Sequence, residues 1–171
     1  EDMHRKKVKH NITTAGKITQ AYPLDSFIQE TCEQLNLKRN AFSGTKIAFD
    51  CANSMSTVDA KAFFNFLGAD IVYINDWLDG SFPAHEPNPM IPFNLRTLQS
   101  LVQNRSFLCG ATGDGDYDRV GIIDEAGNKL EAHTIASMVF RHITKGSSEK
   151  VNAIYSTTMG RAFKEVIEEN G

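Results

Sequence analysis

Apolar residues recur along this chain at two spacings, and each spacing predicts one type of element. Spacings of three and four residues, typical of a helix with one buried face, occur in five segments. These helical segments cover about 23–37, 56–67, 93–103, 135–143 and 159–167. Short, mostly apolar runs between them predict buried strands at 45–51, 71–74, 107–112, 120–124 and 151–156. The chain is therefore expected to alternate helices with strands.

Local signals set the ends of several elements. Pro23 suits the first residue of a helix, and Ser56 with Asp59 three residues later has the spacing of a capping box. Gly68 would end that helix. A proline-rich loop is expected from Asn75 to Pro92, and a turn at 126–128 predicts a hairpin. The fold class that follows is α/β with three layers, in which helices cover both faces of a mostly parallel mixed sheet and the hairpin adds an antiparallel pair at one edge.

Composition narrows the class of partner. The 171 residues are 41% apolar, which is enough for a sizeable core, and the net charge is −3. No basic stripe suggests nucleic acid; the basic stretch at 4–10 is interpreted as a solvated terminus. No apolar run approaches the ~20 residues of a membrane helix. Three cysteines at unrelated spacings indicate reduced thiols. We therefore expect a cytoplasmic protein with neither nucleic acid nor membrane as partner.

The acidic heptapeptide at 113–119 carries the clearest chemistry. Asp114, Asp116 and Asp118 are carboxylates at every second position, with Arg119 next to them. Such neighbours raise one another's pKa unless a cation or protons neutralise them, and hard oxygen ligands suit Mg²⁺ or Ca²⁺. The glycines at 113 and 115 would allow a tight turn around one ion. Arg119 is suited to holding phosphate. The alternative is a solvated acidic turn.

Two other acidic motifs fit these residues less well. In an EF-hand loop the three aspartates would fill positions one, three and five, and Glu125 would fill position twelve, but Arg119 stands where a glycine is needed. In a haloacid-dehalogenase-type phosphotransferase, an upstream Asp-x-Asp is required. Asp50 is the upstream candidate, and Ala52 replaces its second aspartate.

The proline-rich loop has its own candidate residue. Three prolines between Phe82 and Pro89 stiffen the chain without regular hydrogen bonds. His85 in this loop could act as a ligand or as an acid or base. A lone loop histidine is more often a hydrogen-bonded structural residue, and we favour that interpretation.

Several motifs together resemble one family, the α-D-phosphohexomutases of the phosphomannomutase/phosphoglucomutase type. The motifs are Gly-Lys-Ile at 16–18 followed by Tyr22, Lys-Ile-Ala-Phe-Asp at 46–50, Leu-Gly-Ala-Asp at 67–70, Phe-Pro-Ala-His-Glu-Pro-Asn-Pro at 82–89 and Asp-Gly-Asp-Tyr-Asp-Arg at 114–119. They occur in the family's order. The resemblance implies that the loop at 82–89 is structural and lies near the metal loop. The stretch 51–55 departs from the family's glycine-richer turn at that position.

The resemblance also implies how the chain is organised. Family members have four domains, and the Ser-His-Asn-Pro-type serine loop of the first does not occur here. We expect a piece centred on domain two. Residues 1–44 would be the tail of the preceding domain and a connecting helix, 45–146 the central metal-loop domain, and 147–171 the first strand and helix of the next domain. The strand at 151–156 would then fray or pair with a second copy, giving a homodimer.

The function implied is phosphoryl transfer between the 1- and 6-positions of a hexose phosphate, mannose or glucose 1- or 6-phosphate. Asp114, Asp116 and Asp118 would hold Mg²⁺, and Arg119, as the catalytic residue, would neutralise phosphate charge. The phosphoserine would come from another domain of the same polypeptide, so the isolated chain should be inactive. The alternative is a non-catalytic regulatory or interaction module that retains a Mg²⁺-binding loop. A serine loop encoded upstream would favour the mutase.

Overall fold

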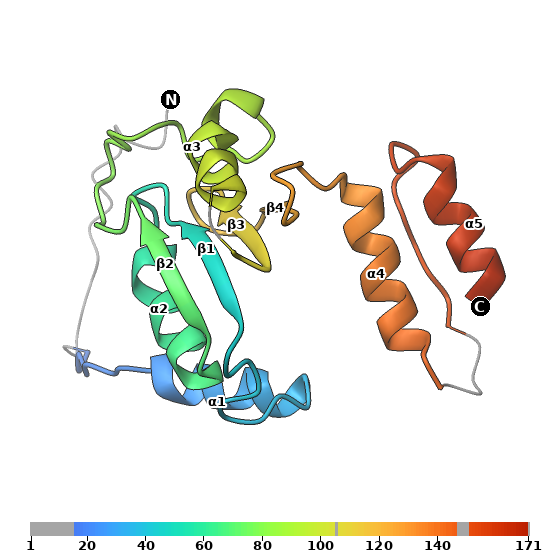
Figure 1. Cartoon of the computed structure of the whole chain (residues 1–171). Coiled ribbons are helices and arrows are strands. Elements are labelled where there is room, and N and C mark those ends of the chain that lie inside the picture. The colour runs from blue at the N-terminus through green and yellow to red at the C-terminus, as the bar shows by residue number, and fades with distance from the viewer. Residues whose placement is uncertain (1–15, 105, 147–150, 171) are drawn as a thin grey trace, which may run out of the picture.

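Helices and strands alternate along the part of the chain that the computed structural model describes, residues 16–104, 106–146 and 151–170 (Figure 1). The basic stretch at 4–10 lies outside these residues, as does the start of the segment predicted at 147–171. The elements are α1 (Leu24–Gln34), β1 (Lys46–Asp50), α2 (Ser56–Leu67), β2 (Asp70–Ile74), α3 (Pro92–Gln103), β3 (Cys109–Gly113), β4 (Val120–Ile123), α4 (Ala132–Thr144) and α5 (Arg161–Asn170).

The strands form one mixed sheet in the order β2-β1-β3-β4. β1 pairs in parallel with both β2 and β3, and β4 runs antiparallel to β3 at one edge. The predicted fold class, a three-layer α/β fold with a mostly parallel sheet, is confirmed. The antiparallel pair differs from the prediction, because β3 and β4 are joined across the acidic loop. The turn at 126–128 adds a bridge between Ile123 and Lys129.

The two faces of the sheet have separate apolar cores because neighbouring residues of a strand point to opposite faces. Ala48 of β1 packs with Leu98 and Val102 of α3. The next residue, Phe49, lies edge-on to Phe64 of α2, with ring centroids 5.5 Å apart. α1 packs against the last turns of α2, where Ile28 and Cys32 pack with Leu67, Phe63 and Phe66. Burying each large side chain contributes about 1.5–3 kcal/mol.

Several predicted boundaries are confirmed, and two predictions are wrong. Gly68 ends α2 in the left-handed conformation, with φ of 72°. The capping box is wrong: Met55 is the N-cap without a side-chain hydrogen bond, and the Ser56 hydroxyl donates to the Cys51 carbonyl at 3.2 Å. The strand predicted at 151–156 is also wrong. That segment pairs with no strand of the described residues, so its apolar pattern does not produce a ladder.

α4 and α5 lie side by side, apart from the sheet (Figure 1). Phe140 of α4 and Phe163 of α5 meet edge-on at 6.2 Å, and Tyr155 contacts Phe163 at 5.5 Å. We predicted α4 as part of the central domain, whereas its main contacts are with α5. The domain boundaries themselves stay a prediction. Among the described residues, no helix has both the length and the apolar character required to span a bilayer.

Candidate metal centre

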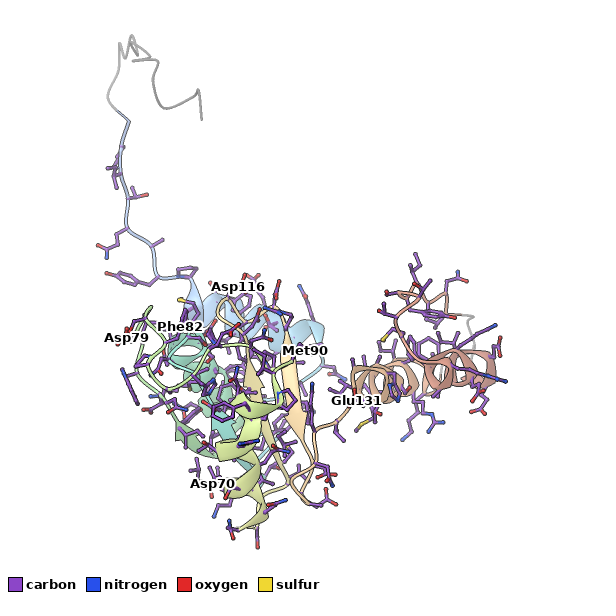
Figure 2. All side chains as sticks on the ribbon, turned by 90° about the horizontal axis from the view of Figure 1, so that it is seen from above. Asp70, Asp79, Phe82, Met90, Asp116 and Glu131 are labelled. Carbon is purple, nitrogen blue, oxygen red and sulfur yellow. The ribbon has the colours of Figure 1, made fainter. Side chains whose placement is uncertain are left out.

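The acidic loop connects β3 to β4 at one end of the sheet. β3 ends at Gly113, so Asp114 is the first residue after the carboxyl end of a strand that runs parallel to β1. In α/β proteins the carboxyl ends of parallel strands are where ligands bind. Figure 2 shows Asp116 at this end of the molecule, together with Phe82 and Asp79, whereas Asp70 lies at the opposite end.

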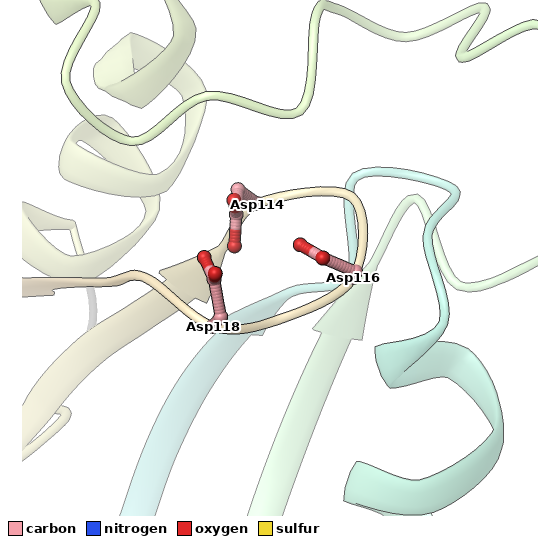
Figure 3. A group of neighbouring side chains, drawn as sticks. All are labelled: Asp114, Asp116 and Asp118. Atoms are coloured by element: carbon pink, nitrogen blue, oxygen red, sulfur yellow. The ribbon is translucent and has the colours of Figure 1, made fainter.

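The three predicted metal ligands are brought together. Each of Asp114, Asp116 and Asp118 offers an oxygen, and these oxygens all lie within 4.8 Å of one another. Figure 3 shows the three side chains turned toward a common space inside the loop. Asp114 is buried, while Asp116 and Asp118 are exposed. The carboxylates of Asp116 and then Asp114 raise the pKa of Asp118 above its ordinary value. A bound cation would remove this repulsion.

Arg119 fixes the buried carboxylate. Its backbone N–H donates to Oδ1 of Asp114 at 2.9 Å, and its Nε donates to Oδ2 at 2.7 Å. Burial alone would raise the pKa of Asp114, but the hydrogen bonds and charge of Arg119 outweigh it and hold that pKa below its ordinary value. The sequence predicted Arg119 as a phosphate contact; in the structure it holds Asp114 and also lies 3.7 Å from Asp118. Its side chain is about half exposed, which leaves it accessible to an anion.

The turn is made differently from the prediction. We expected the glycines at 113 and 115 to supply the tight turn, yet the residue in the left-handed region is Tyr117, with φ of 66°. The Tyr117 ring packs on Phe49, with centroids 5.9 Å apart. It also occupies the space where a side chain at Gly113 would be, because a Cβ there would lie 2.1 Å from Cε2 of Tyr117. Gly113 is therefore required to make room for the ring.

A second polar group lies where β1 ends, beside the acidic loop. Asp50, the last residue of β1, is buried and faces Nε2 of His85 at 3.0 Å. The other ring nitrogen of His85 lies 2.8 Å from the Glu86 carbonyl, which agrees with a structural role. Asn53 holds the same proline-rich loop: its amide nitrogen donates to the Trp77 carbonyl, and its amide oxygen accepts from the Ala84 N–H.

Sequence reasoning missed Asp50 and Asn53 as members of this end of the sheet. The sequence places Asp50 where a nucleophile could stand, but Ala52 replaces the second aspartate that this chemistry needs. No other role for Asp50 followed from the sequence. The signal that could have found both residues is their position at the carboxyl end of a buried parallel strand, the same end of the sheet at which Asp114 follows β3. Ala52 and Asn53 also take left-handed conformations, with φ of 48° and 55°, where the family resemblance expects a glycine-richer turn.

The comparisons with known proteins agree on one family. The family model for phosphoglucomutase/phosphomannomutase, alpha/beta/alpha domain II, matches residues 25–127. A phosphomannomutase of Methanocaldococcus jannaschii is 34% identical over 90% of this chain, which corresponds to 38% of that protein. A phosphomannomutase/phosphoglucomutase of Pseudomonas syringae is 27% identical over 99% of the chain and 36% of that protein.

A solved structure shares the fold. The crystal structure of a phosphoglucomutase/phosphomannomutase family protein from Burkholderia thailandensis superposes with a TM-score of 0.81 at 22% identity, over 90% of this chain and 32% of that one. The chain thus spans a little over a third of the length of the curated relatives named above.

Proposed function

We propose that the acidic loop is the Mg²⁺-binding part of an enzyme that moves a phosphoryl group between the 1- and 6-positions of a hexose phosphate. The premise is that this chain belongs to the phosphoglucomutase/phosphomannomutase family. The observation that carries the proposal is the convergence of Asp114, Asp116 and Asp118 at the end of β3. Phosphoryl transfer relies on positioning and on neutralisation of charge more than on covalent help from the protein.

The residues of the loop fit Mg²⁺. Mg²⁺ prefers carboxylate oxygens and keeps several waters, and two of the three carboxylates here are open to water. Asp114 would be the fixed ligand because Arg119 binds both of its oxygens. Asp116 and Asp118 would complete the protein's share of the coordination. When bound, Mg²⁺ supplies Lewis-acid chemistry that draws charge off a phosphate.

Arg119 has the second role in the proposal. Its guanidinium is half exposed beside the carboxylates, so a phosphate that approaches the loop meets a fixed cation. Arg119 would neutralise part of that phosphate charge as it develops during transfer. The phosphate would belong to a phosphoserine on another domain of the same polypeptide, and the substrate would be mannose or glucose 1- or 6-phosphate. The cytoplasm is the proposed location; all three cysteines lie in the described residues and are free.

Calorimetric titration of the chain with Mg²⁺ tests the metal role. We expect a dissociation constant on the order of millimolar, about 4 kcal/mol of binding free energy, because three carboxylates leave the ion largely hydrated. Asp116→Asn should abolish the binding. Glu125→Gln is the matched control: Glu125 is exposed and lies outside the cluster, and it would be a ligand only in an EF-hand loop. Micromolar affinity, or an affinity unchanged by Asp116→Asn, would contradict the proposal.

A mutase assay tests the placement of the phosphoserine. The isolated chain, supplied with mannose 1-phosphate or glucose 1-phosphate and glucose 1,6-bisphosphate as activator, should show no turnover above a heat-inactivated control. Turnover in this assay would mean that the phosphoryl donor lies within these 171 residues, which contradicts the proposal.

A further inference from the structure

The proline-rich loop is attached to the end of β1 through a buried carboxylate. Asp50 is 1% exposed, and its Oδ1 accepts from the Ala52 N–H and from Nδ2 of Asn75, both at 2.9 Å. Its Oδ2 lies 3.0 Å from Nε2 of His85. A buried carboxylate is costly unless it is paired and hydrogen-bonded. His85 completes the set of partners around Asp50.

The hydrogen-bonding capacities of these groups determine what His85 contributes. The Glu86 carbonyl can only accept, so Nδ1 of His85 must carry a proton to bond it at 2.8 Å. An ionised Asp50 can also only accept, so the contact at Nε2 requires one further proton between the ring and the carboxylate. His85 therefore joins two acceptors that would otherwise have no common donor. One acceptor belongs to the sheet, and the other to the proline-rich loop.

The same loop lies over the acidic loop and packs on β4, through residues on both sides of His85 in the sequence. A Cβ at Gly115 would lie 3.6 Å from Cγ of Pro87 and 3.7 Å from Cζ of Phe82. Further along, a Cβ at Gly121 of β4 would lie 2.8 Å from Cβ of Pro89, which is fully buried. Figure 2 places Phe82 and Asp116 at the same end of the molecule.

Gly115 stands between two of the candidate metal ligands, Asp114 and Asp116, and is held by a backbone hydrogen bond. Its carbonyl accepts from the Met55 N–H at the start of α2, at 3.5 Å. Phe82 and Pro87 of the proline-rich loop lie over it, with space for one methyl group between. Asp114 is already fixed by Arg119, whereas Asp116 is exposed and has no such anchor among the described contacts. The position of Asp116 therefore depends on how Gly115 is held.

We propose that His85 is a positioning residue for the metal centre: by joining Asp50 to the proline-rich loop, it keeps Phe82 and Pro87 over Gly115 and so limits how far Asp116 can move from Asp114. The inference rests on the proposed metal role of the acidic loop. It assigns no contact between His85 and the ion.

The test measures Mn²⁺ affinity by water-proton relaxation in the 171-residue chain and in His85→Ala. We expect the dissociation constant to rise about tenfold, the lower end of what the loss of an outer-shell contact costs. His85→Gln retains an N–H donor toward Asp50 and should restore most of the affinity. His133→Ala, the same substitution on α4, should leave the affinity unchanged.

A destabilised control separates positioning from general loss of stability. Leu98→Ala removes a core side chain on the α3 face of the sheet; at a temperature where the variant is still folded, its Mn²⁺ affinity should equal that of the native chain. If His85→Ala does not fold, the double variant Asp50→Asn/His85→Ala, which buries no unpaired charge and cannot form the link, takes its place in the same titration and should also bind Mn²⁺ more weakly.

A second readout needs no metal. In amide NMR spectra of the metal-free chain, His85→Ala should shift the Gly115 and Asp116 signals and speed exchange of the Met55 amide. If the native chain binds Mn²⁺ and His85→Ala changes neither the affinity nor these signals, the positioning role is overturned and the metal site stays in place. Absence of Mn²⁺ binding in the native chain would instead overturn the proposed function, and the metal-free signals alone would then decide whether His85 shapes the loop.

Discussion

The sheet region, residues 24–130, and the α4–α5 pair both carry amphipathic helices, but they bury their apolar side chains to different extents. In the sheet region, Leu98 and Val102 of α3 are fully buried against the sheet, as is Phe49 against α2. In the α4–α5 pair, Phe140 and Phe163 are buried, while Met138, Val139 and Ile143 of α4 are more than half exposed and Ile154 is fully exposed.

The difference shows that periodicity predicts a helix but not its partner. Apolar residues at three- and four-residue spacing predict an amphipathic helix. Most of the stability of such a helix in a protein comes from the surface against which its apolar face packs. The sheet supplies that partner for α2 and α3. For α4 the structure supplies α5, which the segment at 151–156 also contacts through Tyr155.

Hydrogen exchange should show the largest contrast between the two regions. β1 is paired with β2 on one side and with β3 on the other. Its amides should therefore exchange only through global unfolding, at a cost of about 5–15 kcal/mol for a typical domain. Amides at 151–156 have no ladder and should exchange at nearly the unprotected rate. Protection there that rises with protein concentration would indicate the predicted homodimer. Protection equal to that of β1 and independent of concentration would mean that residues 151–156 are as stably folded as the sheet.

Core truncation should separate the regions by several kcal/mol. Leu98→Ala removes a fully buried side chain from the α3 face and should lower the free energy of unfolding by about 2–5 kcal/mol. Ile143→Ala, the matched apolar truncation on the exposed side of α4, should change it by no more than about 0.5 kcal/mol. Urea denaturation followed by circular dichroism measures both. Equal losses would mean that α4 shares the core of the sheet.

A smaller effect is expected from Tyr73 in β2. Its hydroxyl is buried without a hydrogen-bond partner in the described part of the chain, so Tyr73→Phe should stabilise the sheet region by about 1 kcal/mol at neutral pH. Burial raises the pKa of Tyr73 to about 12. The neutral form is thus favoured in the folded state, and its contribution is present below pH 10, the ordinary Tyr pKa, and lost as the pH rises toward 12.

Alkaline unfolding checks the sign of this effect. Cys51, whose pKa burial raises to about 11, should contribute in the same direction between pH 9 and 11. Tyr73→Phe should therefore unfold at a higher pH than the native chain. An unchanged alkaline midpoint, together with a loss of stability at neutral pH, would show that the hydroxyl has a partner in solution.

Much of the fold could be predicted from local pattern because the sheet region follows its own propensities. Gly68 ends α2 as expected, and the strands lie within two residues of their predicted bounds in β1, β2, β3 and β4. The failures lie where tertiary contacts replace local rules. Ser56 has the sequence position of a cap, but its hydroxyl bonds the carbonyl of Cys51 instead, because the chain turns back at the end of β1.

The candidate site was predictable in its ligands but not in its support. Three aspartates at every second position of one short loop carry like charges that a single cation can neutralise. Asp114, Asp116 and Asp118 were therefore expected to converge. The reason for Gly113 could not be read from the sequence, since it depends on where the Tyr117 ring packs. The contact between His85 and Asp50 joins residues 35 positions apart, and no local spacing indicates such a pair.

If three carboxylates of the acidic loop bind one divalent cation, anomalous diffraction from a crystal grown with Mn²⁺ will locate that ion. We expect one anomalous peak inside the loop, within about 2.0–2.6 Å of an oxygen from each of Asp114, Asp116 and Asp118, as for oxygen ligands of hard cations. The peak should disappear in Asp116→Asn. A peak elsewhere on the chain, or one that persists in that variant, would mean that the three carboxylates of the acidic loop are not the cation site.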